Sequence, residues 1–178
     1  MRILVEDALA EFPTKQVKIE TPCGVYDGVQ TLPPTEICAV SIMRSGDALL
    51  EAVREVEPAC KVGKILIQRN ESSRNKQAML FYTKLPENIE KMFVLLLDPM
   101  LATGGSAMLA MKVLCQDFSV DPKKIIFCNM ICAPEGLRCL SRAYPMVRIV
   151  TTVVDEKLNN EKYILPGLGD FGDRFYNT

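Results

Sequence analysis

Short runs of consecutive apolar residues alternate along the chain with segments whose apolar residues recur every three or four positions. An apolar run predicts a strand buried on both faces, whereas the three-to-four spacing predicts a helix with one buried side. Strands are expected at 37–42, 62–68, 78–83, 92–97, 125–130 and 147–154, and helices at 2–12, 47–56, 107–118 and 134–143. The alternation predicts one α/β domain whose parallel sheet is covered by helices on both faces.

Three segments depart from this alternation. Residues 17–20 and 25–29 flank the turn TPCG and are typical of a β-hairpin. The polar run RNESSRNKQ, residues 69–77, has no periodicity and predicts a mobile surface loop. The tail YILPGLGDFGDRFYNT, residues 163–178, is rich in glycine and is expected to be a loop with fixed turns.

Composition and charge exclude several classes of partner and of catalytic site. The net charge of −1 gives no reason to expect a nucleic acid or a membrane surface as partner. The apolar runs are far shorter than the roughly 20 residues that span a bilayer, and the acidic N-terminus is not a signal peptide. Seven cysteines without a CxxC pair indicate buried thiols in a reducing cytoplasm. Histidine is absent, which excludes histidine bases, triads and metal sites.

The stretch LLLDPMLATGGSA, residues 95–107, joins an apolar run to a predicted helix through one acid and a glycine-rich turn. Free N–H groups at a helix N-terminus suit a phosphate, and glycines let the backbone approach it. The stretch is neither a Walker A loop nor GxGxxG. Helix capping would explain TGGS alone, but Asp98 at the strand end has no such structural reason. Residues 98–106 are therefore a candidate binding loop.

Two arginines directly follow predicted strands. Arg44 comes after ICAVSIM and Arg69 after VGKILIQ. A guanidinium fork binds phosphate through two hydrogen bonds, although a surface salt bridge would use the same residue. Asp47, close behind Arg44, is expected to cap the next helix. Because ligands of parallel sheets bind beyond the carboxyl ends of the strands, both arginines are candidates for an anion site.

The tail segment PGLGDFGD, residues 166–173, places Asp170 and Asp173 beside glycines. A glycine-rich surface turn is the plainer interpretation, and the D-x-D-x-D-G pattern of a calcium loop is missing. Two anion-binding loops and an acidic glycine loop at one sheet edge indicate a phosphorylated sugar or nucleotide as ligand. The pattern by itself does not define the reaction.

These motifs are similar to those of the uracil phosphoribosyltransferases, which have the type I phosphoribosyltransferase fold. The resemblance runs from about residue 15 to Thr178, and its FGDR tail looks more eukaryotic or protist than bacterial. It implies an α/β fold with a mostly parallel twisted sheet, helices on both faces and a hairpin-like flexible arm. It also implies a single domain over 1–178, a mobile loop or hairpin at 69–84 and a uracil-binding segment at 155–178. The segments that carry it are SIMRSGDAL, GKILIQRNE, YTKLPENI, LLLDPMLATGGSA, APEG, RIVTTVVDEKLN and YILPGLGDFGDRFYNT.

The reaction implied by the resemblance joins N1 of uracil to phosphoribosyl pyrophosphate (PRPP), giving UMP and pyrophosphate in pyrimidine salvage. Asp98, Arg69 and Asp170 are the implied catalytic residues, with Asp98 on the ribose hydroxyls and Asp170 on PRPP or its magnesium. Arg44 and Arg69 would hold the pyrophosphate, and the helix N-terminus would hold the 5-phosphate. The implied PRPP site comprises Arg44, Arg69, Asp98, Pro99, Met100, Leu101, Ala102, Thr103, Gly104, Gly105, Ser106 and Asp170, and the implied uracil site Ile164, Gly169, Asp170 and Phe171.

The resemblance further implies Mg²⁺ as cofactor, carried on PRPP rather than in a dedicated protein site. It implies a cytoplasmic homodimer, with a tetramer as the alternative, and GTP as an effector. Three features depart from the family pattern. Pro99 follows Asp98 where the common type I fingerprint has a second acid, and the tail ends FYNT rather than YFGT. Members also carry an extra helical arm before the point where this chain begins, which leaves the oligomeric state open.

Two other interpretations remain. A catalytically silent module that senses nucleotides or binds a partner would have the same fold, but the complete set of candidate site residues disfavours it. A phosphoribosyltransferase for another base is disfavoured by PGLGDFGDR.

Overall fold

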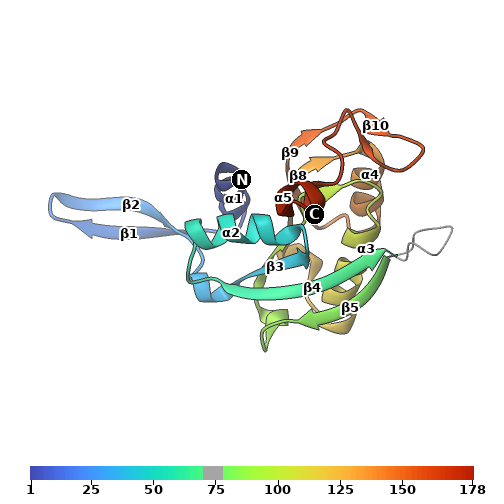
Figure 1. Cartoon of the computed structure of the whole chain (residues 1–178). Helices are drawn as coiled ribbons and strands as arrows, with labels where there is room; N and C mark the ends of the chain where they lie inside the picture. Colours follow the sequence, from blue (N-terminus) through green and yellow to red (C-terminus); the bar gives the residue numbers. More distant parts are fainter. Residues whose placement is uncertain (70–77) are drawn as a thin grey trace.

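The computed structural model describes residues 1–69 and 78–178, and it shows a central sheet between two layers of helices (Figure 1). The hydrogen-bonded order is β5-β4-β3-β6-β8, and β7 and β9 both pair with β8. Among the described strands of this sheet, β5 alone runs antiparallel to its neighbour. The predicted mostly parallel α/β sheet is confirmed. Its strands are β3 (Ile37–Met43), β4 (Lys61–Arg69), β5 (Ala78–Lys84), β6 (Phe93–Leu97), β7 (Met100–Leu101), β8 (Ile125–Cys132) and β9 (Arg148–Val154).

Two helices cover each face of the sheet. α1 (Arg2–Ala10) and α2 (Gly46–Val56) pack their apolar sides on one face, where Leu49 and Val53 meet Leu95 and Leu97. α3 (Gly105–Lys112) and α4 (Pro134–Ala143) cover the other face. None of the described helices is long and apolar enough to cross a membrane. A π-helical stretch over Val113–Asp117 continues α3, and 3-10 turns lie at Pro34–Glu36, Ile89–Lys91 and Pro122–Lys124.

β6 and β7 lie on the same side of β8 and are separated by Asp98 and Pro99. Leu97 pairs with Cys128, and the pairing resumes between Met100 and Ile131. Between these pairs, the carbonyl oxygen of Pro99 accepts hydrogen bonds from the N–H groups of Met130 and Ile131, each over 3.0 Å. The interruption therefore places Asp98 at the carboxyl edge of the sheet, where ligands of parallel sheets bind.

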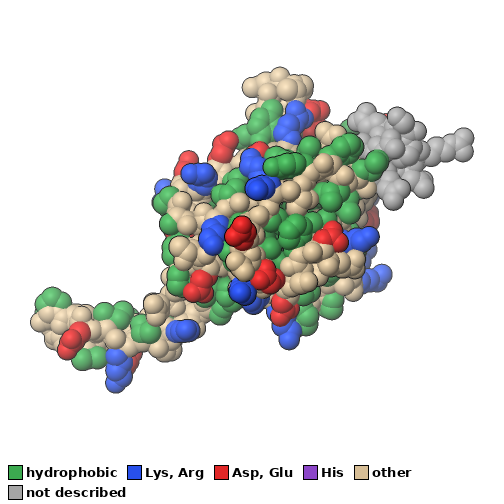
Figure 2. Space-filling model, turned by 90° about the horizontal axis from the view of Figure 1, so that it is seen from below, with side chains coloured by type: hydrophobic (Ala, Val, Ile, Leu, Met, Phe, Trp, Pro, Cys, Tyr) green, Lys and Arg blue, Asp and Glu red, His purple; other side chains and the backbone are tan. Residues whose placement is uncertain are grey.

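The predicted N-terminal hairpin is confirmed, and it extends away from the body as an arm (Figure 1). β1 (Lys15–Thr21) and β2 (Gly24–Gln30) pair antiparallel. Figure 2 shows hydrophobic side chains along this arm, among acidic and basic ones. Val25 is 66% exposed and Tyr26 is 64% exposed, so the arm buries few apolar side chains of its own.

The tail contains a helix where the sequence predicted a loop. α5 (Phe171–Tyr176) begins at Asp170, whose carboxylate accepts from the N–H of Asp173 over 3.0 Å. The rings of Phe171 and Phe175 stack 5.5 Å apart, and Asn177 ends the helix with φ of 56°. The prediction was wrong because a capping carboxylate and aromatic packing outweigh the glycine content. Upstream, β10 (Lys157–Leu158) and β11 (Ile164–Leu165) form a short antiparallel pair.

The predicted mobile segment is only partly within the described structure. β4 continues to Arg69, and β5 begins at Ala78 and pairs with it, so the two strands form the expected hairpin. The predicted loop itself, residues 70–77, lies outside the described residues.

Candidate functional site

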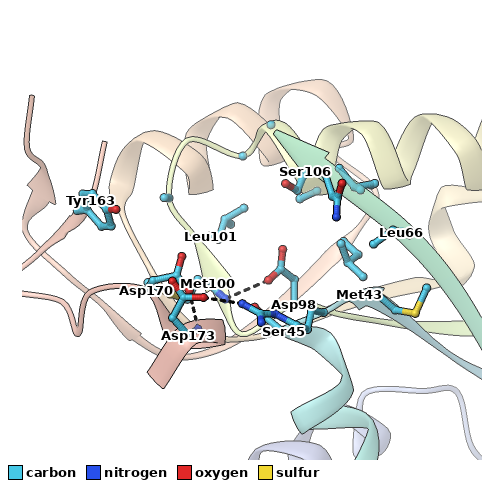
Figure 3. A pocket seen from close by; sticks show the side chains of 18 residues that line it. Met43, Ser45, Leu66, Asp98, Met100, Leu101, Ser106, Tyr163, Asp170 and Asp173 are labelled. Atoms are coloured by element: carbon cyan, nitrogen blue, oxygen red, sulfur yellow. Dashed lines mark hydrogen bonds and ion pairs between the residues drawn. The ribbon is translucent and has the colours of Figure 1, made fainter. Parts of the chain in front are cut away.

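A cavity of about 760 Å³ opens beyond the carboxyl ends of β3 and β6 (Figure 3). Its walls come from the turn after β3, from β4, from the stretch after β6 and from the tail. The sequence therefore brings together, at one cavity, three loops that lie far apart in the chain. The predicted site residues in its lining are Arg44, Asp98, Met100, Leu101, Ala102, Gly104, Gly105, Ser106 and Asp170.

The N-terminus of α3 faces this cavity. Gly104 has a φ of 87°, a conformation that favours glycine, and its carbonyl oxygen accepts the first helical hydrogen bond from Met108 over 2.8 Å. The Thr103 hydroxyl accepts from the N–H of Gly105 over 3.4 Å. Because Gly104, Gly105 and Ser106 all line the cavity, the positive end of the helix dipole is directed at whatever anion occupies it.

α4 packs closely behind this loop. A Cβ atom at Gly136 would lie 2.5 Å from the carbonyl oxygen of Ala102 and 2.8 Å from that of Leu101. Both are backbone atoms that have no free rotation, so only glycine fits. This contact is the physical reason for the glycine of APEG, and it fixes the position of the 101–104 backbone.

Asp98 presents a carboxylate at the edge of the cavity (Figure 3). The residue is 9% exposed, and its Oδ1 accepts from the N–H of Met100 over 3.3 Å. The sequence offered no structural reason for an acid at this position. The hydrogen bond from Met100 gives the carboxylate a local structural role. The neighbouring Pro99 and Thr103 do not belong to the lining of the described cavity.

Asn129 supports Asp98 from the interior and was missed by the sequence reasoning. It is fully buried, and its Nδ2 donates to the carbonyl oxygens of Asp98 and Ile131 over 3.1 Å and 3.2 Å. Its Oδ1 accepts from the hydroxyl of Thr151 over 2.8 Å. The available clue was a single polar residue inside the otherwise apolar run IIFCNMIC.

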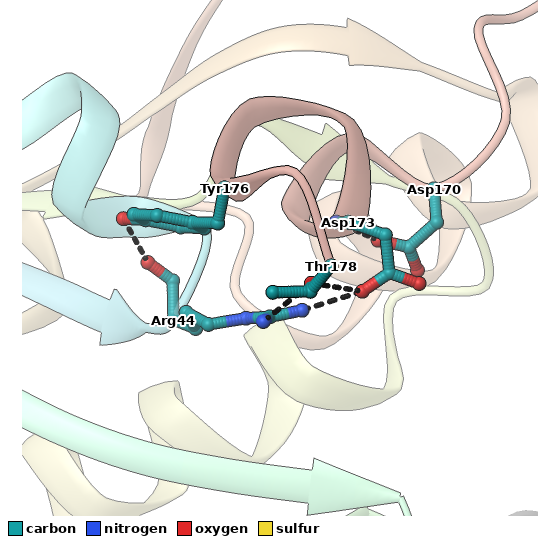
Figure 4. A network of polar contacts seen from close by, with 5 residues as sticks. All are labelled: Arg44, Asp170, Asp173, Tyr176 and Thr178. Atoms are coloured by element: carbon teal, nitrogen blue, oxygen red, sulfur yellow. Dashed lines mark hydrogen bonds and ion pairs between the residues drawn. The ribbon is translucent and has the colours of Figure 1, made fainter.

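Arg44 lies in the turn between β3 and α2 and is bonded to the end of the chain (Figure 4). Its guanidinium donates to Asp173 over 2.6 Å and to Thr178 over 3.0 Å. Asp173 and Tyr163 line the cavity but were not among the predicted site residues. The glycine-rich tail had indicated Asp173 as an available acid, whereas nothing singled out Tyr163.

Tyr176 also contacts the Arg44 turn, and its hydroxyl donates to the carbonyl oxygen of Arg44 over 3.0 Å. Burial raises the pKa of Tyr176, Asp47 and Glu51 add to the rise, and Arg44 opposes it. The phenol therefore stays protonated at neutral pH and remains a donor. The expected role of Asp47 as a helix cap was wrong. Its carboxylate accepts from Lys64 over 3.0 Å and from Ser41 over 2.6 Å instead.

The remaining predicted site residues are not part of the cavity lining that the structure describes. Arg69 ends β4, and its side chain lies outside what the structure describes. Ile164 is buried against Ile131 and Ala133. Phe171 is 8% exposed at the start of α5, and Gly169 is exposed with φ of 80°. The roles assigned to these residues remain predictions.

The described residues contain no group of three or more Asp, Glu, Cys or His side chains that would hold a metal by itself. Three separate carboxylates, those of Asp98, Asp170 and Asp173, nevertheless line the same cavity, and the carboxylate of Asp173 is bonded to Arg44. Oxygen donors of this kind fit Mg²⁺, which typically keeps several waters and binds one or two carboxylates together with substrate phosphates.

Comparison of the fold gives the class. A xanthine-guanine-hypoxanthine phosphoribosyltransferase from Helicobacter pylori superposes with a TM-score of 0.53 over 86% of this chain and 85% of its own, at 13% identity. The AQ2163 protein from Aquifex aeolicus superposes with a TM-score of 0.83 over 98% of this chain and 81% of its own, at 36% identity. The chain thus has the fold of the phosphoribosyltransferases.

Sequence comparison gives the family. Residues 1–178 match the family model described as uracil phosphoribosyltransferase. Uracil phosphoribosyltransferase 1 of Schizosaccharomyces pombe is 46% identical over 100% of this chain and 80% of its own length. The uracil phosphoribosyltransferase of Saccharomyces cerevisiae is 45% identical over 99% and 80%. The chain belongs to the uracil phosphoribosyltransferase family.

Proposed function

We propose that this chain transfers the phosphoribosyl group of PRPP to N1 of uracil in the described cavity, releasing pyrophosphate and forming UMP. The observation that carries the proposal is the convergence of three different groups on one cavity. They are the N-terminus of α3, the carboxylate of Asp98 and the guanidinium of Arg44. A phosphate, a ribose diol and a pyrophosphate need these three kinds of partner.

The 5-phosphate of PRPP would bind at residues 102–106. The N–H groups at the start of α3 and the hydroxyl of Ser106 would provide donors, and the helix dipole favours the negative charge. Asp98 would accept hydrogen bonds from the ribose hydroxyls at the neighbouring edge of the cavity. Held at both ends, the sugar would present its anomeric carbon toward the tail.

Arg44 would neutralise charge on the departing pyrophosphate, joined by Arg69 from the end of β4. Cleavage at an anomeric carbon passes through a state with oxocarbenium character, as in glycoside hydrolysis. The protein's task is then electrostatic stabilisation and alignment of the two substrates. This chemistry needs no histidine base, and the chain has no histidine.

Uracil would bind at the tail, against Ile164 and the backbone of residues 169–171. Two carbonyls and the N3–H of uracil form an acceptor–donor–acceptor edge that backbone groups can complement. Asp155 accepts from the N–H of Gly167 over 2.8 Å, and Glu135 accepts from the N–H of Leu158 over 3.2 Å. The first bond attaches the tail to the residue that follows β9, and the second attaches β10 to α4, so both support a fixed base site.

We include Mg²⁺ in the proposal, held near Asp98 and Asp170 and chiefly on the phosphates of PRPP. When bound, the ion would offset the negative charge of the pyrophosphate. Asp170 would contribute an oxygen to the ion or to its waters while its carboxylate also caps α5.

The proposal extends to location and assembly. All seven cysteines are free, which supports a reducing, cytoplasmic compartment. The exposed apolar side chains of the β1–β2 arm support a homodimer, with a tetramer as the alternative. GTP as an effector remains a prediction from the family resemblance.

The direct test is UMP formation from radiolabelled uracil and PRPP, with and without Mg²⁺ and GTP. We expect UMP only when PRPP and Mg²⁺ are both present. An Asp98→Asn variant should fold normally and lose about 100-fold in turnover, the scale of one charge-assisted hydrogen bond. A folded protein that binds UMP but makes none would be a silent module. Turnover of another base in place of uracil would define a different phosphoribosyltransferase.

A further inference from the structure

The end of the chain holds Arg44 in the wall of the cavity. Nη2 of Arg44 donates to Oδ1 of Asp173 over 2.6 Å, and Nη1 donates to Oγ1 of Thr178 over 3.0 Å. The guanidinium also lies over the ring of Tyr176, with 5.4 Å between Cζ and the ring centroid (Figure 4). Because Tyr176 donates to the backbone carbonyl of Arg44 as well, the tail contacts both the main chain and the side chain of this residue.

These contacts matter because Arg44 is exposed. Its side chain is 49% exposed, and it follows directly after a strand. A long side chain of this kind loses much conformational freedom when a ligand orders it, and this loss weakens binding. Contacts that order the guanidinium beforehand reduce the loss at the moment of binding.

The contacts leave Arg44 able to bind an anion. A guanidinium carries five N–H donors in a fixed fork. The bonds to Asp173 and Thr178 use one donor on each of two nitrogens. Donors therefore remain for a phosphate oxygen while Asp173 stays in place, and the cavity includes both residues in its lining.

α5 is itself positioned by the tail loop. The carboxylate of Asp170 accepts from the N–H of Asp173, so the residue that faces the cavity also sets the start of the helix. A Cβ atom at Gly172 would lie 2.9 Å from Oγ of Ser45 and 3.4 Å from Nη2 of Arg44. The helix thus packs directly on the turn that carries Arg44.

We propose that Asp173 is a positioning residue, which with Thr178 and Tyr176 orients the guanidinium of Arg44 toward the pyrophosphate group of PRPP. The inference rests on the proposed function in one respect, the assignment of Arg44 to pyrophosphate. It adds a functional role for the last residues of the chain, which would couple the base-binding tail to the pyrophosphate site.

An Asp173→Ala variant tests this role cleanly. The bond that caps α5 uses the backbone N–H of Asp173, and the bond from the N–H of Thr178 uses its carbonyl oxygen, so both survive the substitution. Alanine is also the best helix former. The side-chain contacts with Arg44 and Thr178 are lost. Asp7→Asn on α1, an exposed acid on a different element, is the matched control for removal of one negative charge.

The first measurement is calorimetric binding of pyrophosphate with Mg²⁺, which needs no turnover. We expect Asp173→Ala to weaken pyrophosphate binding about tenfold, Thr178→Ala to weaken it less, and Asp7→Asn to leave it unchanged. In an Arg44→Ala background, Asp173→Ala should have no further effect, because the two residues act as one unit. In steady-state assays the KM for PRPP should rise about tenfold, whereas the KM for uracil should stay within about twofold.

Several results would overturn the inference. They are unchanged or tighter pyrophosphate binding by Asp173→Ala, additive effects in the double variant, and a KM for uracil that rises as much as the KM for PRPP. Failure of the proposed function is a different observation. A wild-type protein that binds pyrophosphate as expected, and whose variants weaken it as expected, but that makes no UMP, would overturn the proposed reaction and support the role of Asp173.

Discussion

The side-chain amide of Asn129 donates a hydrogen bond to the backbone carbonyl oxygen of Asp98 over 3.1 Å, from a position with no solvent exposure. The same amide lies beside the break between β6 and β7, and its other donor bond goes to the carbonyl oxygen of Ile131 on its own strand, β8. The oxygen of the same amide accepts a hydrogen bond from the hydroxyl of Thr151 on β9. The carboxylate at the cavity edge thus depends on a buried polar group in the next strand.

Replacing Asn129 with alanine should destabilise the fold. The substitution removes the amide's hydrogen bonds to two carbonyl oxygens and its bond from the Thr151 hydroxyl, and we expect the free energy of unfolding to fall by about 2–4 kcal/mol. Urea unfolding measures the loss. Asn160→Ala is the control, because Asn160 is exposed, and it should change stability by less than about 0.5 kcal/mol. Equal stabilities of the two variants would contradict a structural role for Asn129.

A second prediction concerns Gly136, which packs behind residues 101–104, and Gly105 at the start of α3. Gly136→Ala would push a methyl group to within 2.5 Å of the carbonyl oxygen of Ala102, so helix and loop must separate. We expect a loss of about 1–3 kcal/mol, the usual cost of overpacking. Gly105→Ala is the matched control, because its nearest neighbour would be the Thr103 hydroxyl at 3.7 Å.

Thermal unfolding of both glycine variants measures the two effects on stability. The melting temperature of Gly136→Ala should fall clearly, while that of Gly105→Ala should stay level or rise, since alanine favours a helix. If Gly136→Ala has the same melting temperature as the wild type, the close contact with α4 is not what fixes the backbone of residues 101–104.

The base site should discriminate between uracil and cytosine. Cytosine presents an amine where uracil presents a carbonyl, so a donor of the site would face a donor and remain unpaired. We expect kcat/KM for uracil to exceed that for cytosine by at least about tenfold, the scale of one lost hydrogen bond. A competition assay with both bases measures the ratio directly. Equal use of the two bases would rule out recognition by fixed backbone groups.

The buried thiols predict how stability changes with pH. Burial raises the pKa of Cys128 to about 12, and burial with a smaller effect of Cys60 raises the pKa of Cys38 from 9.0 to about 12. Above pH 9 the unfolded chain loses these protons while the folded protein keeps them, so unfolding is favoured as pH rises. Stability should be constant below about pH 8 with respect to these groups, and each should contribute a loss of about 1 kcal/mol between pH 9 and pH 10.

Urea unfolding at pH 8, 9 and 10 tests this. Other groups also titrate in this range, so the comparison is between variants. Cys128→Ala should lose less stability between pH 9 and pH 10 than the wild type, whereas Cys23→Ala, at an exposed position, should lose the same amount. An identical pH dependence in all three proteins would contradict the effect of burial.

The sequence predicted most of the fold because the central strands are buried on both faces. β3 is apolar along nearly its whole length, and 37–42 was recognised from that run alone. The resemblance to uracil phosphoribosyltransferases, and the activity that it implied, are confirmed by the family model and by relatives of 45% and 46% identity. The implied phosphoribosyltransferase fold is confirmed by the solved structures.

The features that the sequence did not predict depend on contacts between distant segments. α5 has six residues and lies in a glycine-rich stretch, so its local pattern resembles a turn, and its contact with Arg44 spans 129 positions. Aspartate is a common helix cap, but the carboxylate of Asp47 instead accepts a hydrogen bond from Lys64 on β4. Asn129 showed a clue in its apolar run, but its partners became visible only with the register of β8 and β9.

The central claim is that one cavity holds the 5-phosphate at the start of α3 and the base at the tail. A crystal structure of the protein with UMP and pyrophosphate tests it most directly. We predict the phosphate of UMP on the N–H groups of residues 102–106, the ribose hydroxyls at Asp98, pyrophosphate beside Arg44, and uracil against residues 169–171. A nucleotide bound elsewhere, or with its phosphate at Arg44 and its base at α3, would contradict the account.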